Sequence, residues 1–334
     1  MEIMKLLEYA KSIARKVDSF IVSTVDGKPR ELYEAALHYI RAGGKRLRPL
    51  MTVLAARIAG GSEDVAIPAA AAIEVLHTFT LVHDDIIDRD EFRRGVPTVH
   101  KLWGTDTAIV AGDILYAYAY RCLLRATELG IEHSRIVKAV EYLTEGAIRV
   151  AEGQMLDMLF SRRDRVTVDE YIEMVERKTS ALFVAAVSMG AVLGGGDEMT
   201  ILRLREAMRL AGIAFQIRDD ILGLVGDEKI LGKPILSDLR EGKRTILVIY
   251  AMQRLDDEHR EWLLKVLGNS QASVEELKKA AEMITNTGAV DYADKLAREY
   301  AGKARHIIES IECRDANAKE MLFELVDYLV ERRF

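Results

Sequence analysis

The pattern of apolar and polar positions predicts a chain built almost entirely of helices. Residues 1–21 alternate apolar and charged side chains at helical spacing, as an amphipathic helix does. Only five prolines occur, and none lies in 98–233 or 235–334, so helices can run through both ranges. Thr167–Glu170 and Ser273–Glu276 have the form of capping boxes that open helices. We therefore predict an all-α protein with ten or more helices in one bundle.

One apolar stretch, residues 69–94, carries three carboxylates inside it and is expected to be a buried helix that starts after Pro68. Ionised Asp is rarely buried unless it is paired or bound to a metal ion. On a helix, Asp84 and Asp88 project from one face, one turn apart, with Asp85 beside them. Such a pair suits Mg²⁺, which binds through one or two carboxylates plus substrate phosphates. The alternative is a solvated acidic helix end.

A second acidic cluster follows much later in the chain, within residues 215–222. Asp219 and Asp220 again stand beside an apolar helical face. This repetition suggests two acidic clusters that face each other across one cavity.

A basic turn precedes both clusters. Gly43 and Gly44 leave the backbone without side chains, and Lys45, Arg46 and Arg48 follow at once. Backbone N–H groups and cations in this arrangement are suited to a phosphate, although a basic helix start on the surface has the same composition.

His77 lies two turns before Asp84 on the same helix face. Glu74 and His77 also have the Glu-x-x-His form found in di-iron helical bundles. None of the other histidines supplies a second such motif, which disfavours the di-iron alternative.

Composition limits the remaining classes. The 334 residues are 49% apolar and 30% charged, as in an ordinary globular protein. A formal net charge of −6 gives no basis for nucleic-acid binding through bulk electrostatics. The two cysteines form no disulfide framework or zinc motif, and the start lacks a signal peptide's apolar core. The most apolar window, 181–196, is too short to span a membrane, so we expect no membrane span and a cytoplasmic location.

Together these motifs, in this order, resemble the trans-polyprenyl diphosphate synthases, and most closely the archaeal-type geranylgeranyl diphosphate synthases. The resemblance extends from about residue 40 to 250. It implies a single domain over residues 1–334 with a deep central cavity, a homodimer, and about three Mg²⁺ ions per site. It also implies head-to-tail condensation of isopentenyl diphosphate with dimethylallyl, geranyl or farnesyl diphosphate.

The resemblance also implies a role for each motif residue. Mg²⁺ would be held by Asp84, Asp88 and Asp219, with Asp85 and Asp220 in support. Isopentenyl diphosphate would be bound by Lys45, Arg48, His77 and Arg94. The allylic diphosphate would be bound by Arg93, Lys178, Lys233 and Lys243. Thr179 and Gln216 would turn oxygen atoms toward the developing carbocation.

The sequence departs from the family at one motif position. The second acidic motif often ends in Asp, but Gly223 stands there, and the next Asp is Asp227. Glycine has no side chain to bind a metal, so Asp219 is expected to coordinate directly and Asp220 through water, while the role of Asp227 stays open. Arg332 and Arg333, near the C-terminus, are candidates to fold over the cavity mouth.

Product length is expected to depend on the helix before Asp84. Phe79 and Thr80, with no insertion in the DDIID motif, resemble the archaeal geranylgeranyl pattern, so mainly the twenty-carbon product with some farnesyl diphosphate is expected. The alternatives are a farnesyl or bifunctional synthase, a terpene cyclase, and a non-catalytic subunit of a heteromeric synthase. Tyr116 and Tyr118, within the apolar run 108–124, are candidates for a subunit interface or for the core.

Overall fold

The computed structural model describes residues 2–226 and 235–331. Its internal contacts divide the chain into two compact units. Unit 1 comprises the residues up to Ala147 together with Leu182–Met208 and Arg305–Leu325. Unit 2 comprises Ile148–Ala181, the described part of Arg209–Ala304, and the residues from Val326 onward.

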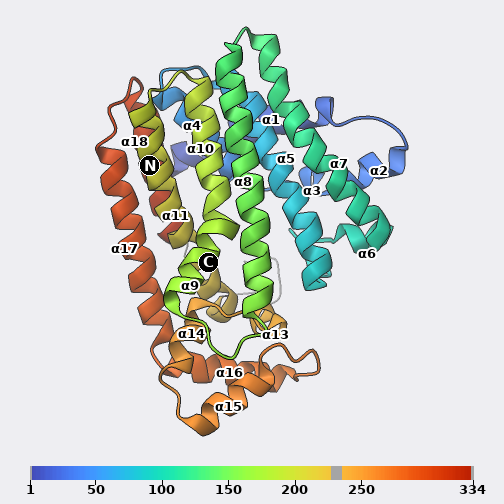
Figure 1. Cartoon of the computed structure of the whole chain (residues 1–334), viewed down its shortest axis with the longest axis vertical. Helices are drawn as coiled ribbons and strands as arrows, with labels where there is room; N and C mark the ends of the chain where they lie inside the picture. Colours follow the sequence, from blue (N-terminus) through green and yellow to red (C-terminus); the bar gives the residue numbers. More distant parts are fainter. Residues whose placement is uncertain (1, 227–234, 332–334) are drawn as a thin grey trace. The chain divides into compact units, whose positions relative to one another are not determined.

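Helices dominate the described residues (Figure 1). Unit 1 holds α1 (Glu2–Thr24), α2 (Arg30–Ala36), α3 (His38–Arg41), α4 (Leu47–Ile58), α5 (Glu63–Asp88), α6 (Val99–Trp103), α7 (Thr105–Leu124) and the 3₁₀ helix η1 (Arg125–Leu129). Unit 2 holds α9 (Val168–Val175), the π-helix η2 (Glu176–Ser180), α13 (Ser237–Glu241), α14 (Ile246–Met252), α15 (Asp257–Val266) and α16 (Val274–Asn286). Both units receive residues from α8 (His133–Phe160), α10 (Ala181–Leu193), α11 (Glu198–Val225), α17 (Ala289–Glu309) and α18 (Ala316–Glu331). The predicted all-α class with ten or more helices is confirmed.

Helix α5 forms the core of unit 1. It packs most extensively against α7 and also contacts α4 and α1. Its residues 69–73 are fully buried. The predicted start after Pro68 is wrong, because the helix begins at Glu63 and Pro68 lies inside it. Glu63 and Asp64 occupy the first turn, where the positive end of the helix dipole favours acidic side chains.

Among the described helices, α5 alone is long and apolar enough to span a membrane. This is weak evidence for a membrane span, because 72% of the apolar window is buried inside the protein. The apolar window 181–196 named from the sequence is not such a candidate among the described residues.

Two short strands are the part of unit 1 that the sequence pattern missed. β1 (Phe92–Arg93) pairs antiparallel with β2 (Val96–Pro97). Arg94 and Gly95 connect them with φ values of 54° and 76°, and a positive φ at both central residues is the mark of a type I′ hairpin turn. Glycine is common at such positions but arginine is not, so the pair gave no hairpin signal.

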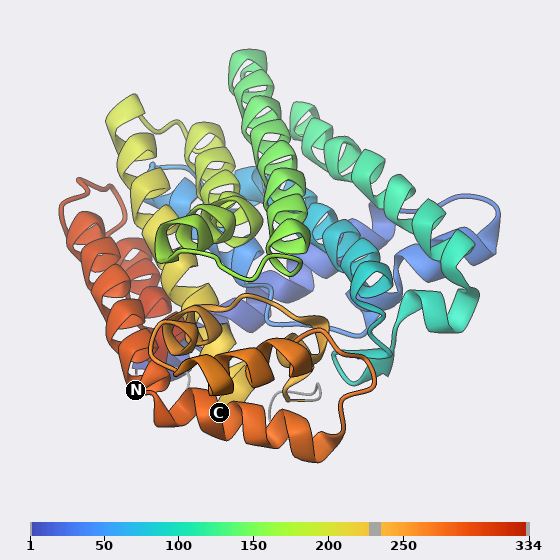
Figure 2. The ribbon, with the colours of Figure 1, turned by 60° about the horizontal axis from the view of Figure 1, so that its bottom comes forward.

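In unit 2, helices α9 and α16 begin with caps that the sequence predicted. The Thr167 hydroxyl accepts from the backbone N–H of Glu170, whose carboxylate accepts from the backbone N–H of Thr167, and the same reciprocal pair joins Ser273 and Glu276. Both predicted capping boxes are confirmed. Figure 2 brings forward the orange helices α14, α15 and α16, of which α16 contacts the other two.

Candidate active site

The carboxylates of the first acidic motif lie in the last turns of α5. Asp84 and Asp88 are partly exposed, whereas Asp85 is fully buried. No basic residue occurs in the last turn of α5, so Asp84 and Asp88 stand at the negative end of a helix dipole. This part of unit 1 therefore attracts cations.

Asp85 is held by protein groups. The hydroxyl of Tyr39 donates to one carboxylate oxygen, and Arg93 Nε donates to the other at 2.5 Å. Burial raises the pKa of Asp85 to about 6, against the nearby Arg93 charge, which lowers it. Arg93 also pairs with Asp90 at 3.2 Å. Arg93, expected to bind the allylic diphosphate, therefore neutralises Asp85 in this structure.

The β1–β2 hairpin brings Arg94 back to the basic turn. Arg94 Nη1 donates to the backbone oxygens of Tyr39 and Gly43, at 3.0 Å and 2.6 Å. Arg94 Nη2 lies 3.6 Å from Glu74 Oε1. The Glu74 carboxylate is thus engaged by arginine, which gives no support to the di-iron alternative.

The basic turn separates its three cations. Lys45 is exposed, and Arg48 is partly exposed, with its guanidinium 5.0 Å from the centre of the Phe183 ring. Arg46 lies between them and points inward, with no exposed side-chain surface. Lys45 and Arg48 were the residues predicted to bind a diphosphate, and they are the two that reach solvent.

His77 lies on α5, close to the arginine side chains of the basic turn and the hairpin. Its burial, followed by the positive charges of Arg48 and Arg94, holds the pKa of His77 well below its ordinary value of 6.5. The ring is therefore neutral at pH 7 and can donate one hydrogen bond while accepting another.

In unit 2, the π-helix η2 presents Lys178 and Thr179. Such single-turn π segments recur at functional sites. Two glycines let neighbouring helices approach it closely. A Cβ on Gly153 of α8 would lie 2.2 Å from the Lys178 backbone N, and one on Gly212 of α11 would lie 2.4 Å from Ser180 Oγ. Lys178 Nζ donates to Asp157 Oδ2 at 2.5 Å, so α8 also orients this lysine.

A chain of hydrogen bonds links η2 to the second acidic motif on α11. The Thr179 hydroxyl donates to Gln216 Oε1 at 2.7 Å, and Gln216 Nε2 donates to Asp220 Oδ1 at 2.9 Å. The hydroxyl of Tyr171 donates to Asp220 Oδ2 at 2.7 Å. Burial, followed by the negative charge of Asp238, raises the pKa of Asp220 to about 7. Asp219, by contrast, is partly exposed.

Tyr171 was missed by sequence reasoning. It lies seven residues before Lys178 and is 1% exposed. The only available signal was that a buried tyrosine hydroxyl normally finds a polar partner.

The departure at Gly223 has a structural counterpart. A Cβ at this position would lie 2.9 Å from Asp238 Oδ2. Another carboxylate thus occupies the space beside the missing side chain. Lys243 Nζ pairs with Glu241 and lies 3.8 Å from Asp238 Oδ1. The predicted roles of Lys233, Asp227, Arg332 and Arg333 lie outside the described residues.

The donor set agrees with the way Mg²⁺ binds proteins. Within residues 2–226 and 235–331, no group of three or more His, Cys, Asp or Glu side chains is arranged to hold a metal ion alone. Mg²⁺ usually needs only one or two carboxylates, because waters and substrate phosphates supply its other ligands. Asp84 and Asp88, both partly exposed on one face of α5, fit that requirement.

Comparison with known proteins identifies the class. A family model described as polyprenyl synthetase matches residues 29–284, and the chain belongs to this family of prenyltransferases. The family and enzyme class expected from the sequence are confirmed.

Individual relatives place the chain among archaeal enzymes. It is 48% identical to a geranylfarnesyl diphosphate synthase of Aeropyrum pernix, over 95% of this chain and 99% of that one. It is 43% identical to a geranylgeranyl diphosphate synthase of Sulfolobus acidocaldarius, over 97% and 98%. The crystal structure of a geranylgeranyl pyrophosphate synthetase from Pyrococcus horikoshii superimposes with a TM-score of 0.91 at 37% identity, covering 99% of this chain and all of that chain.

Proposed function

We propose that this prenyltransferase condenses isopentenyl diphosphate with allylic diphosphates and releases mainly geranylgeranyl diphosphate, with some farnesyl diphosphate. The observation that carries the proposal is the pair Phe79–Thr80 before the uninterrupted DDIID motif on α5. Thr80 lies four residues before Asp84, about 6 Å along the helix axis, where a small side chain leaves room for a growing chain.

The neighbouring aromatic ring is held in a defined position. Phe79 packs edge-on against His83 and Tyr116, with ring centroids 4.8 Å and 5.3 Å apart. The Thr80 hydroxyl donates to the backbone oxygen of His77 at 2.8 Å. In the proposal, the small side chain of Thr80 permits elongation beyond fifteen carbons, and Phe79 is held in place by its aromatic neighbours.

The motif residues divide the work between two substrates and the metal. About three Mg²⁺ ions would be bound by Asp84, Asp88 and Asp219. The residues for isopentenyl diphosphate would be Lys45, Arg48, His77 and Arg94. The residues for the allylic diphosphate would be Arg93, Lys178, Lys233 and Lys243. When bound, Mg²⁺ supplies Lewis-acid stabilisation of the departing diphosphate.

The chain's own residues then have three tasks. Fixed cations meet negative charge as the carbon–oxygen bond of the allylic diphosphate breaks. Thr179 and Gln216 place oxygen and amide dipoles beside the resulting cation, and apolar side chains exclude water that would quench it. Loss of a proton from the condensed cation, for which the released diphosphate is the proposed base, completes the step.

A longer product is the second candidate. The relative from Aeropyrum pernix, at 48% identity, is a geranylfarnesyl diphosphate synthase, which makes a twenty-five-carbon product a specific alternative. Both candidates share the same chemistry and differ only in where elongation stops.

Product sizing separates the candidates. The full chain is incubated with Mg²⁺, isopentenyl diphosphate and each allylic primer in turn, and the dephosphorylated products are sized by chromatography. We expect the twenty-carbon alcohol to dominate, and Thr80→Phe to shift the product to fifteen carbons. Thr80→Ser, which keeps the hydroxyl, is the matched control and should leave the product unchanged. A dominant twenty-five-carbon product, or no shift in Thr80→Phe, would contradict the proposal.

The expected homodimer and single domain remain part of the proposal. On α7, Ile109, Val110 and Tyr116 are exposed and form a candidate subunit face. Tyr118 is 7% exposed and donates to the backbone oxygen of Asp26 at 2.9 Å, so it belongs to the core of unit 1. Light scattering after size-exclusion chromatography tests the dimer.

A further inference from the structure

A buried ion pair lies behind the basic turn of unit 1. Arg46 Nε donates to Asp18 Oδ1 at 2.7 Å, and Arg46 Nη1 donates to Glu74 Oε1 at 2.9 Å. Arg46 also donates to the backbone oxygens of Gly43 and Ile40, at 3.2 Å and 2.7 Å. The Arg46 and Glu74 side chains are 0% and 3% exposed. Arg46 therefore uses its guanidinium to hold the protein and has no surface left for a ligand.

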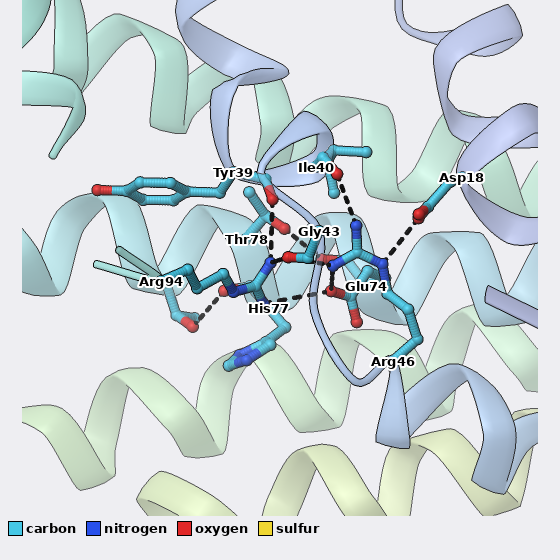
Figure 3. Close-up of polar contacts among 10 residues, drawn as sticks. Asp18, Tyr39, Ile40, Gly43, Arg46, Glu74, His77, Thr78 and Arg94 are labelled. Atoms are coloured by element: carbon cyan, nitrogen blue, oxygen red, sulfur yellow. Dashed lines mark hydrogen bonds and ion pairs between the residues drawn. The ribbon is translucent and has the colours of Figure 1, made fainter. Parts of the chain in front are cut away.

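The same two acceptors also hold Arg94. Gly43 O accepts from both arginines, and Glu74 Oε1 lies 2.9 Å from Arg46 Nη1 and 3.6 Å from Arg94 Nη2. Figure 3 shows the two guanidinium groups meeting at Gly43 and Glu74, with His77 close by. Two like charges can share this space because a carboxylate lies between them.

The backbone of the turn depends on these contacts. Arg46 has φ 47°, a left-handed conformation that is costly for a residue with a side chain and persists only where its surroundings enforce it. A Cβ on Gly44 would lie 2.8 Å from Arg46 Nη1 and 3.0 Å from Arg94 Cζ. The turn is thus packed closely around both guanidinium groups, and Lys45 follows it as an exposed residue.

We propose that Glu74 and Arg46 are positioning residues that orient Arg94 and the Gly43–Lys45 turn for isopentenyl diphosphate. This inference rests on the proposed function. Neither residue touches the ligand. Glu74 lies on α5, one helical turn before His77. Its carboxylate neutralises Arg46 and holds Arg94 beside α5. The allylic diphosphate, assigned to other residues, should be bound independently of this pair.

The test separates the two substrates. In Glu74→Gln, which keeps the shape and removes the charge, the KM for isopentenyl diphosphate should rise about ten- to a hundredfold, the usual effect of losing a hydrogen bond to a charged group. The KM for the allylic substrate should change much less, because Arg93 is held by Asp85 and Asp90 and not by Glu74. Glu74→Asp, which restores the charge, should recover part of the loss.

A second measurement asks whether the effect passes through Arg94. Arg94→Met should raise the same KM, and the double variant should be no worse than Arg94→Met alone, because coupled residues are not additive. Direct titration with isopentenyl diphosphate should show the same losses of affinity without turnover.

The control is another carboxylate of α5. Glu63 binds Lys16 and Tyr9, both at 2.7 Å, far along the helix from the acidic motif. Glu63→Gln should lower the unfolding midpoint and leave both KM values unchanged. Equal rises in both KM values in Glu74→Gln, or additive effects with Arg94→Met, would overturn the inference. Wild-type enzyme that makes no product from isopentenyl diphosphate would instead contradict the proposed function.

Discussion

Restoring the family's acidic residue at Gly223 should destabilise this protein. Gly223 lies inside α11, and a Cβ there would lie 2.9 Å from Asp238 Oδ2. The contacting atom, Asp238 Oδ2, is at the end of a side chain that can rotate away, so the steric cost of a Cβ is small. An introduced Asp would still place a second negative charge near Asp238.

Two opposing effects, the gain from replacing a helix glycine and the repulsion between carboxylates, are compared by their free energies. Replacing a glycine inside a helix by alanine gains about 0.5–1 kcal/mol, and replacing it by aspartate gains less. Two carboxylates about 4 Å apart repel by about 1 kcal/mol in bulk water and about 4 kcal/mol at an effective dielectric constant of 20. Asp219, one turn earlier on α11, adds about 0.2–0.5 kcal/mol. Repulsion therefore exceeds the helix gain, and Gly223→Asp should be less stable than Gly223→Asn by about 1–4 kcal/mol.

The assay is urea unfolding of the Asp and Asn variants in EDTA, which removes divalent ions that would bridge carboxylates. Asn has the shape of Asp without its charge, so the difference isolates repulsion. The double variant Gly223→Asp with Asp238→Asn should recover most of the loss. If the Asp and Asn variants unfold at the same urea concentration, Asp238 does not exert the repulsion argued here.

Three further predictions concern unit 1 and the metal. The unfolded chain protonates His77 near pH 6.5 while the folded chain does not, because its pKa is held well below that value. The contribution of His77 to stability should therefore fall by about 1.4 kcal/mol from pH 7.5 to 5.5. Asp85 and Asp220, whose pKa values are raised, contribute with the opposite sign. The measurement is therefore the difference between wild type and His77→Gln in urea unfolding across this pH range. Tyr39→Phe should lower the free energy of unfolding by about 1.5–3 kcal/mol, since it removes a hydrogen bond to the buried Asp85. EDTA should abolish turnover, restored by excess Mg²⁺, yet leave the thermal midpoint unchanged, because the described residues hold no three-ligand structural metal group.

The helices and their caps were predictable because their signals are local. Thr167 and Ser273 each bond a glutamate three residues later, a spacing that is visible in the sequence and sufficient to open a helix. The acidic residues of α5 were likewise visible as carboxylates in an apolar run. Their functional meaning came from the order of several motifs, and not from any one of them.

The features that were missed depend on partners distant in sequence. Lys45, Arg46 and Arg48 look equivalent in the sequence, yet Arg46 turns inward because Glu74, 28 residues away, offers a buried carboxylate. The β1–β2 hairpin has strands of two residues, too short for an alternating pattern to appear. Tyr171 gains its role from Asp220, 49 residues later.

The two acidic motifs follow one physical rule, each within its own unit. Consecutive helix residues point about 100° apart, so the two members of an Asp-Asp pair cannot share one environment. Asp85 and Asp220 are the buried members, and each accepts a hydrogen bond from a buried tyrosine. Burial raises the pKa of both, to about 6 and about 7, so both hold a proton more readily than an exposed Asp does. The preceding Asp of each pair, Asp84 or Asp219, is the one that reaches solvent. In the proposed function, this division leaves Asp84 and Asp219 available to a metal ion, while Asp85 and Asp220 are held by protein groups.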